Sequence, residues 1–205
     1  MKEEEYKEKE RSKERNKENI LDNHQLSKEE LRDTKASRDE FKNIERIEVY
    51  ILLDGLKVAH NIGTILRLSD ALLIKKVYIC GDTIVPPNYK IRRSSRGSEK
   101  WVPWEYVEDA KEVIKKLKKE GVEITAVEVT NDSIDYRKYK PSFPICLILG
   151  REYDGVSKEL LELSDNTIHL PINGMCNSIN VSNAASVVMY DAYDKYEKHI
   201  DKNYN

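Results

Sequence analysis

Two kinds of hydrophobic patterning alternate along the chain from about residue 46. Short runs that are almost entirely apolar and rich in β-branched residues are separated by stretches with apolar residues every three or four positions. Runs of the first kind are typical of strands buried on both faces, and stretches of the second kind are typical of helices. Their alternation predicts an α/β fold with a mostly parallel sheet flanked by helices. The expected strands are 49–53, 77–80, 123–129, 145–149 and 167–170.

Four helices are expected between and after these strands. They span residues 62–72, 110–119, 157–163 and about 182–198. In the second of them, Val113, Ile114 and Leu117 lie on one side, and Gly121 is a natural end. Residues 24–43 carry a weaker helical pattern, and we expect them to precede or cap the core.

The N-terminal region differs from the rest of the chain in composition. Residues 1–19 consist almost entirely of Lys, Arg and Glu. Such a segment buries too little apolar surface to offset the entropy of ordering, so we expect it to be partly disordered or helical. A role as an arm that grips RNA is the alternative, although charges of both signs balance within the segment. We therefore expect a charged extension over residues 1–45 and one domain over residues 46–200.

Composition and charge exclude several classes of function. The formal net charge of −2 predicts no general affinity for nucleic acid, so any RNA site must be a local basic patch. The three cysteines are far apart and no pair of histidines has metal-ligand spacing, which argues against a disulfide framework and against a metal site. Because the chain has neither a secretory leader nor an apolar run of about 20 residues, we expect a cytoplasmic protein with no membrane partner.

A long connection after the second expected strand carries a basic run. It covers residues 81–104, and its positively charged side chains include Lys90, Arg92, Arg93, Arg96 and Lys100. Trp101, Trp104 and Tyr106 lie at its end and just beyond. Positive charge beside aromatic rings is typical of RNA contacts, so we interpret the run as an RNA-binding surface. The alternative is a solvated loop whose tryptophans fold back into the core.

Three polar clusters lie where strands give way to helices, which is where ligands bind in open α/β sheets. The first contains Asn61 and Arg67, six residues apart. We expect Asn61 to cap the following helix and Arg67 to lie partly on the same side. The alternatives without a functional role are that Asn61 only caps the helix and that Arg67 only forms a surface ion pair with Asp70.

The second cluster, residues 149–155, follows the most apolar strand. Gly150 and Gly155 enclose a charged loop and permit close approach of the backbone to a ligand. Within that loop, Glu152 is expected to pair with a cation, and Arg67 is the candidate. An ordinary turn between a strand and a helix is the alternative.

The third cluster, residues 170–185, is a polar loop that leads into a helix of small residues. Ser178, Asn180 and Ser182 alternate just before the helix begins. Asn180 or Ser182 as the N-cap explains one of these residues but not the whole group.

Together and in this order, the three clusters resemble the signature motifs of the SpoU, or TrmH-like, group of SPOUT RNA methyltransferases. The matching segments are Asn61-x-Gly63-x-x-x-Arg67, Leu149-Gly150-x-Glu152, and Leu170-Pro171 followed by Ser178-Ile179-Asn180-Val181-Ser182. The resemblance runs from about residue 49 to residue 193. The chain departs from the common pattern at Leu73, Arg151, Tyr153 and Asp154, which leaves substrate identity and loop shape open.

The resemblance implies a fold, a cofactor and an assembly. The fold would include a C-terminal trefoil knot at about residues 145–192, which is a rare exception to ordinary topology. S-adenosylmethionine would sit in the knot, and a homodimer would form in which each active site borrows from its neighbour. By position, the cofactor-binding residues would be Thr130, Gly150, Leu170, Ser178 and Ile179.

The implied reaction is transfer of a methyl group to a ribose 2′-hydroxyl of tRNA or rRNA. The resemblance assigns catalysis to Arg67, Asn61, Glu152, Ser178 and Asn180. An arginine holds its proton too strongly to be an ordinary base. We therefore interpret Arg67 as a cation that stabilises the developing alkoxide or an adjacent phosphate, with Glu152 positioning it. Ribose methylation needs no nucleophilic cysteine, so Cys176 is expected to pack within its loop.

Other functions remain open at this point. One is a knotted, cofactor-binding but catalytically inactive RNA-binding protein, against which the presence of Arg67, Glu152 and Asn180 argues. Another is a SPOUT methyltransferase that acts on a base nitrogen, and a third is an unrelated α/β binding domain. The sequence does not distinguish tRNA from rRNA, although the lack of a visible RNA-recognition domain mildly favours tRNA.

Overall fold

The computed structural model describes residues 25–203, so the predictions for residues 1–24 lie outside the described part of the chain. The chain divides into two compact units, Met1–Ile44 and Glu45–Asn205. The first unit contains the short helices α2 (Lys28–Asp33) and α3 (Arg38–Lys42), each with a capping box in which a serine and a glutamate exchange hydrogen bonds with backbone N–H groups. These helices confirm the weak helical pattern of residues 24–43.

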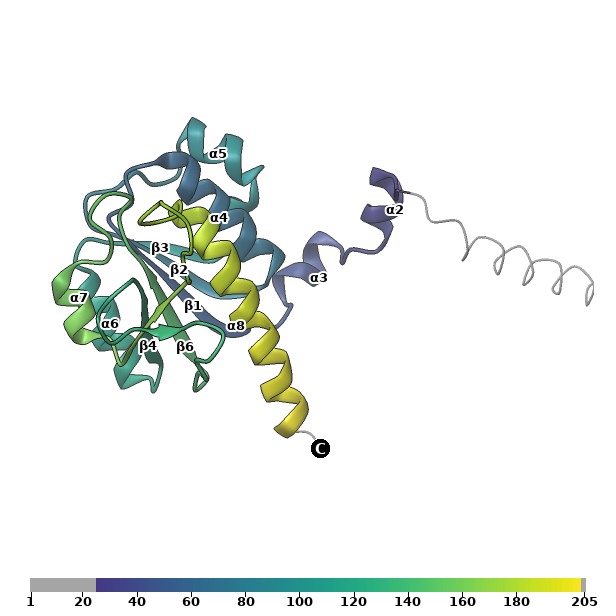
Figure 1. The fold of residues 1–205 in the computed structure, drawn as a ribbon. Helices are drawn as coiled ribbons and strands as arrows, with labels where there is room; N and C mark the ends of the chain where they lie inside the picture. The colour runs from purple at the N-terminus through teal and green to yellow at the C-terminus, as the bar shows by residue number, and fades with distance from the viewer. Residues whose placement is uncertain (1–24, 204–205) are drawn as a thin grey trace, which may run out of the picture. The chain divides into compact units, whose positions relative to one another are not determined.

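The second unit is built on a seven-stranded sheet in which every pairing is parallel (Figure 1). In spatial order the strands are β3-β2-β1-β6-β4-β7-β5. Their bounds are β1 Ile47–Asp54, β2 Ile74–Cys80, β3 Trp104–Val107, β4 Glu123–Val127, β5 Ile134–Asp135, β6 Ile145–Leu149 and β7 Asn166–His169. All five expected strands are present, and the predicted fold class of a parallel sheet flanked by helices is confirmed.

Helices cover both faces of this sheet (Figure 1). Buried side chains of α4 (Ala59–Ala71), α5 (Tyr89–Ser95) and α8 (Val181–Asn203) form one hydrophobic cluster with the sheet. Those of α6 (Ala110–Lys119) and α7 (Lys158–Leu163) form a second cluster on the opposite face. Successive residues of strand β1 alternate between the clusters, since Ile51 and Leu53 belong to the first and Leu52 to the second.

The first cluster fixes the position of the loops that follow the strands. Ile62, Ile65 and Leu66 of α4 and Met189 of α8 are fully buried against β1 and its neighbours. Burial of one such side chain stabilises the fold by about 1.5–3 kcal/mol, so α4 and α8 are held firmly on this face. Because all strands are parallel, their carboxyl ends and the polar clusters that follow them lie along one edge of the sheet.

The segment 81–104 is more structured than expected. It contains α5 and the 3-10 helix η1 (Ser98–Lys100), and it leads into the short strand β3. The α5 helix begins because Oδ1 of Asn88 accepts hydrogen bonds from the backbone N–H groups of Lys90 and Ile91. The sequence analysis expected a long connection and no helix here, because a helix of seven residues with four charged or hydroxyl side chains in a row has almost no apolar periodicity.

The strand ends also differ from expectation. Strand β4 ends at Val127 rather than at residue 129, and the two-residue strand β5 was not expected.

Within residues 25–203, no helix is both long and apolar enough to cross a bilayer. The trefoil knot is not tested by these strand pairings and stays a prediction.

Candidate functional site

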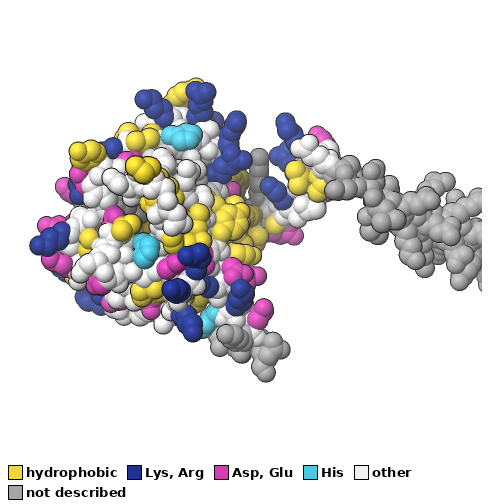
Figure 2. Space-filling view, in the orientation of Figure 1, with side chains coloured by type: hydrophobic (Ala, Val, Ile, Leu, Met, Phe, Trp, Pro, Cys, Tyr) yellow, Lys and Arg dark blue, Asp and Glu magenta, His cyan; other side chains and the backbone are white. Residues whose placement is uncertain are grey.

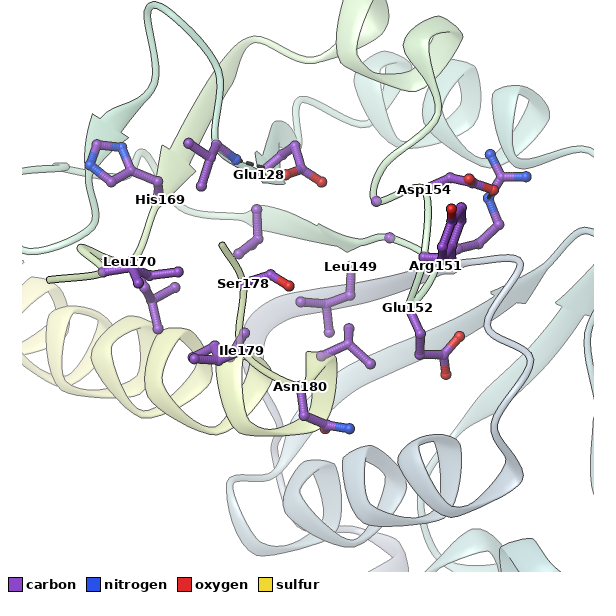
Figure 3. Close-up of a pocket in the computed structure, with 18 residues that line it drawn as sticks. Glu128, Leu149, Arg151, Glu152, Asp154, His169, Leu170, Ser178, Ile179 and Asn180 are labelled. Atoms are coloured by element: carbon purple, nitrogen blue, oxygen red, sulfur yellow. Dashed lines mark hydrogen bonds and ion pairs between the residues drawn. The ribbon is translucent and has the colours of Figure 1, made fainter. Parts of the chain in front are cut away.

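A cavity of about 390 Å³ opens at the carboxyl ends of β4, β6 and β7 (Figure 3). This is the edge of a parallel sheet at which ligands are expected to bind. The cavity walls come from the strand ends, from the loop 150–155 and from the loop 170–180 together with the start of α8. The lining residues are Val127, Glu128, Val129, Leu149, Gly150, Arg151, Glu152, Tyr153, Asp154, Gly155, His169, Leu170, Ile172, Ser178, Ile179, Asn180, Val181 and Ala184.

The loop after β6 folds back tightly on the strand that it leaves. A Cβ atom on Gly150 would collide with the backbone of Gly155 and Val156. Arg151 and Gly155 close this loop with a pair of backbone hydrogen bonds of 3.0 Å each. A glycine is therefore required at residue 150 by the loop's own backbone, and the predicted close approach to a ligand stays a prediction.

A hydrogen-bond network joins all three polar clusters at one side of the cavity. Nδ2 of Asn61 donates to Oε1 of Glu152 at 2.8 Å, and Nδ2 of Asn180 donates to Oδ1 of Asn61 at 3.1 Å. Asn61 is almost completely buried, so each of these bonds replaces water that its amide has lost. The structure thus brings together Asn61, Glu152 and Asn180, three of the five residues predicted to be catalytic.

Glu152 also completes the start of α4. The helix begins after Val58, which has no side chain able to cap it. Instead the Glu152 carboxylate accepts the backbone N–H groups of Lys57 and Val58, both at 3.1 Å. The expectation that Asn61 caps this helix was wrong, because Asn61 already lies inside the first turn and a carboxylate from a distant loop takes that role.

These contacts keep Glu152 ionised. Burial by itself raises the pKa of Glu152, but the hydrogen bonds from Asn61 and from backbone N–H groups outweigh it, and the net pKa lies below the ordinary value of 4.5. Hydrogen bonds donated to a carboxylate stabilise its charged form. At neutral pH the site therefore presents a fixed negative charge beside the cavity.

Arg67 lies apart from this network. It is on the exposed side of α4, it does not line the cavity, and within the described residues it forms no ion pair. The predicted pairing of Arg67 with Glu152 is wrong, since the carboxylate is occupied by Asn61 and the backbone. Six residues along a helix correspond to a rotation of about 240°, so Asn61 and Arg67 leave the helix in different directions.

Four of the five residues expected to hold a cofactor line the cavity, namely Gly150, Leu170, Ser178 and Ile179. Ser178 faces into it, as Figure 3 shows. Thr130 lies outside the lining, in a turn where its hydroxyl donates to Asp132 at 2.9 Å. Because β4 ends two residues earlier than expected, Glu128 takes the place in the wall that the sequence suggested for Thr130.

Two other lining residues were also missed by the sequence analysis. Tyr153 is almost fully exposed at the rim, and His169 ends β7 with its Nδ1 3.0 Å from Oγ of Ser133. The signal for both was their position, since each follows or ends a strand at the edge where the polar clusters lie. Among residues 25–203, no group of three His, Cys, Asp or Glu side chains could hold a metal ion, and the expectation of a metal-free site stays a prediction.

The start of α8 shows which residue caps it. Asn180 precedes the helix, and its Oδ1 accepts the backbone N–H of Ser182 at 2.8 Å and the Ser182 hydroxyl at 2.6 Å. Asn180 is thus the N-cap, one of the two possibilities left open by the sequence. The same side chain reaches Asn61 through its amide nitrogen, so α8 and α4 are tied together beside the cavity.

The basic run lies on α5, on the residue Arg96 that follows it, and on η1, away from the cavity lining. Its side chains are exposed, and in the described part of the chain none of them forms an ion pair; they are Lys90, Arg92, Arg93, Arg96 and Lys100. Lys and Arg side chains gather over α5 in Figure 2. Of the aromatic residues nearby, Trp104 packs against the core and donates from Nε1 to the backbone oxygen of Glu99, whereas Tyr106 is exposed.

Comparison with solved structures places this arrangement among known folds. The TrmH/SpoU tRNA modifying enzyme of Aquifex aeolicus superposes with a TM-score of 0.70 at 28% identity, over 78% of this chain and 83% of that one. The SpoU methyltransferase AviRb from Streptomyces viridochromogenes in complex with AdoMet superposes with a TM-score of 0.68 at 26% identity, over 78% and 62% of the two chains.

Sequence comparison agrees with the structural similarity. The tRNA (guanosine(18)-2′-O)-methyltransferase of Thermus thermophilus is 33% identical over 145 residues, which is 71% of this chain and 74% of that protein. A TrmH-family protein of Staphylococcus haemolyticus is 33% identical over 154 residues, and there the chain spans only 61% of the relative's length. The model of the SpoU rRNA Methylase family matches residues 48–190, which include all three polar clusters. With its parallel sheet, its cavity and its three converging motifs, this chain belongs to the SpoU methylase family.

Proposed function

We propose that this protein is an S-adenosylmethionine-dependent RNA methyltransferase that transfers a methyl group to a ribose 2′-hydroxyl of tRNA or rRNA. The observation that carries the proposal is the convergence of Asn61, Glu152 and Asn180 beside a cavity framed by Gly150 and Ser178. Two structural neighbours that bind AdoMet, the Streptomyces enzyme and an rRNA methyltransferase of Sinorhizobium meliloti, share this fold.

The cavity suits the proposed cofactor in chemistry. Its apolar walls, Leu149, Leu170 and Ile179, offer a surface for an adenine ring, and Ser178 and the backbone beside Gly150 offer polar contacts. The absence of a side chain at Gly150 lets the loop that forms one wall of the cavity fold back on its strand. When bound, S-adenosylmethionine supplies a methyl group that is already activated by its sulfonium charge. The protein then has to bind and align the reacting atoms and to assist loss of the hydroxyl proton.

The hydrogen-bond network positions the groups that meet the RNA. Glu152 and Asn180 hold Asn61 in place, and with Ser178 they form the polar side of the cavity at which the ribose would enter. A site whose side chains are already hydrogen-bonded needs no reorganisation when the reaction begins. We assign Asn61, Glu152, Ser178 and Asn180 this orienting role.

Arg67 is proposed to act as a cation. Its guanidinium is exposed and is not neutralised by a carboxylate of the described residues, so it is available to a phosphate of the RNA or to the developing alkoxide. Glu152 does not hold Arg67 directly. Glu152 instead fixes the first turn of the helix that carries it.

We further propose that the protein works as a homodimer. Val187 and Tyr190 on α8 are exposed apolar or aromatic side chains, 37% and 56% accessible, and they lie three residues apart on one side of the helix. An isologous contact through α8 would bury these side chains in both copies, and each active site is proposed to borrow residues from the neighbouring copy. The trefoil knot at about residues 145–192 belongs to the same proposal.

The basic side chains on α5 and η1 are proposed to bind the RNA backbone. Cations without an ion-pair partner among the described residues gain most from phosphate contacts, because no internal ion pair has to be broken first.

The Thermus and Aquifex relatives are named as tRNA (guanosine(18)-2′-O)-methyltransferases, which makes tRNA the first substrate to test. A cytoplasmic location is proposed with this function, and it is compatible with the three free thiols of the described chain.

The test is incubation of the protein with methyl-labelled S-adenosylmethionine and separate tRNA and rRNA fractions, followed by digestion to nucleosides. Label in a 2′-O-methylnucleoside is the expected result. Label in a base would instead show a methyltransferase that acts on a base nitrogen. Absence of label together with binding of S-adenosylhomocysteine would indicate a catalytically inactive RNA-binding protein.

A further inference from the structure

Glu128 is an ionisable side chain in the cavity that the proposed mechanism does not use. It directly follows β4, and Figure 3 shows it on the cavity wall opposite Ser178. Oε1 accepts the backbone N–H of Val129 at 2.8 Å, and Oε2 accepts that of Val156 at 3.0 Å. The carboxylate is therefore held in one orientation by backbone groups from two different segments.

The loop after β6 is shaped to admit this carboxylate. Gly155 has a positive φ of 70°, and a Cβ atom there would collide with Oε2 of Glu128. A glycine at this position satisfies both the left-handed backbone and the close approach of the carboxylate. Gly155 thus leaves room for the carboxylate, and the backbone N–H of Val156 in the same loop holds it there.

Glu128 has accepting capacity that the described residues do not use. An ionised carboxylate offers about four lone-pair sites, and two are occupied by the backbone. No ion pair of Glu128 exists within residues 25–203, and the only arginine of the lining, Arg151, has its Nε 3.9 Å from Asp154 instead. Because Glu128 lines the cavity, a bound molecule that donates hydrogen bonds could use the remaining sites.

We propose that Glu128 accepts hydrogen bonds from the ribose hydroxyls of the methyl donor, an inference that rests on the proposed function. Glu128 lines the same cavity as Leu149, Leu170 and Ile179, the apolar wall proposed to hold adenine, and the ribose is the part of the donor joined to adenine. The donor's ammonium is several bonds further from adenine than the ribose is, so it would lie beyond the ribose, toward the polar side formed by Glu152 and Asn180. A carboxylate at the end of a parallel strand is suited to a ribose diol, as it is in dinucleotide-binding folds.

The test is calorimetric binding of S-adenosylhomocysteine and of its 2′-deoxy and 3′-deoxy analogues to the wild type and to Glu128→Gln. A hydrogen bond to a charged group predicts a loss of about tenfold or more in wild-type affinity when the bonded hydroxyl is removed. Glu128→Gln should lose a similar factor toward S-adenosylhomocysteine, and removal of the hydroxyl should then have little further effect. Glu162→Gln, an exposed change on α7, is the matched control and should bind like the wild type.

Each other outcome overturns the proposal. Equal affinity of the wild type for the parent compound and both deoxy analogues would exclude it without any variant. A hydroxyl contribution that is the same in the wild type and in Glu128→Gln would show that Glu128 only holds the loop. If Glu128→Gln instead abolished the loss of affinity caused by removing the amino group of S-adenosylhomocysteine, Glu128 would be assigned to the ammonium. A wild type that binds no S-adenosylhomocysteine would reject the proposed function itself, and this inference with it.

Discussion

The side-chain amide of Asn61 donates a hydrogen bond of 2.8 Å to Oε1 of Glu152, although 91 positions separate the two residues in the sequence. Through this bond the loop after β6 is attached to the first turn of the helix that follows β1. Asn180 extends the connection to the start of α8. Three segments that carry the family's motifs are thus held in one arrangement before any ligand binds.

Replacement of Glu152 by Gln should change the dependence of stability on acid. The folded-state pKa of Glu152 lies below its ordinary value of 4.5, so its contribution is present above that value and is lost as the pH falls through the folded pKa. The wild type should therefore lose more stability than Glu152→Gln between about pH 5 and pH 3. Urea denaturation midpoints across this range measure the difference, and parallel curves for the two proteins would contradict it.

Gly63→Ala should destabilise the protein even though alanine favours helices. A Cβ atom on Gly63 would collide with Oγ of Ser94 and with the backbone oxygen of Ile91, where α4 meets α5. Overpacking of this kind lowers the free energy of unfolding by about 1–3 kcal/mol. Replacement of glycine by alanine in a helix raises it by at most about 1 kcal/mol, so the net effect is a loss of stability. Gly174→Ala is the matched control, because nothing lies within 4 Å of the added Cβ. Equal stability of the two variants would refute this account of the contact.

Arg67→Lys should lower methyl transfer without lowering stability. Because Arg67 is exposed and forms no ion pair within the described residues, its removal breaks no internal contact of that kind. A lysine keeps the charge but loses the planar fork that binds an oxyanion through two hydrogen bonds. Turnover should fall at least about tenfold, and the thermal midpoint should stay unchanged; near-normal turnover would rule out the bidentate role.

Neutralisation of Arg92, Arg93 and Arg96 together should weaken RNA binding and flatten its dependence on salt. Each lost phosphate contact lowers the slope of log K against log salt by about 0.7–0.9. The control is neutralisation of three lysines of α6, Lys115, Lys116 and Lys119, which lie on the opposite face of the sheet. Binding titrations at several salt concentrations give both slopes, and unchanged affinity of the arginine variant would reject the α5 surface.

One thiol should react quickly with a disulfide reagent in the native protein, and three after denaturation. Cys80 and Cys146 are buried, and burial raises the pKa of both thiols, that of Cys80 to about 12. Little thiolate forms at these two positions at about pH 8, and the reagent cannot reach them. Cys176 is exposed, which corrects the expectation that it packs within its loop. Rapid reaction of all three thiols in the native protein would contradict the buried positions.

Local pattern alone determined most of the architecture. The runs around Ile51 and Leu147 had to be buried strands, because consecutive apolar residues cannot face water on either side of a sheet. The short elements were not predicted, because pattern needs length. Strand β5 has two residues and α5 has seven, so neither contains enough repeats to show a period. The residues of the three motifs were likewise visible, because their order along the chain is itself the signal.

Which partner each motif residue finds was decided only by the tertiary structure. The sequence paired Glu152 with Arg67 by charge, but in the folded protein the carboxylate satisfies two backbone N–H groups and the Asn61 amide. Buried or half-buried donors must be paired, and that demand depends on which groups the fold removes from water. Glu128 became visible in the same way, since only the end of β4 and the turn at Gly155 place its carboxylate in the cavity wall.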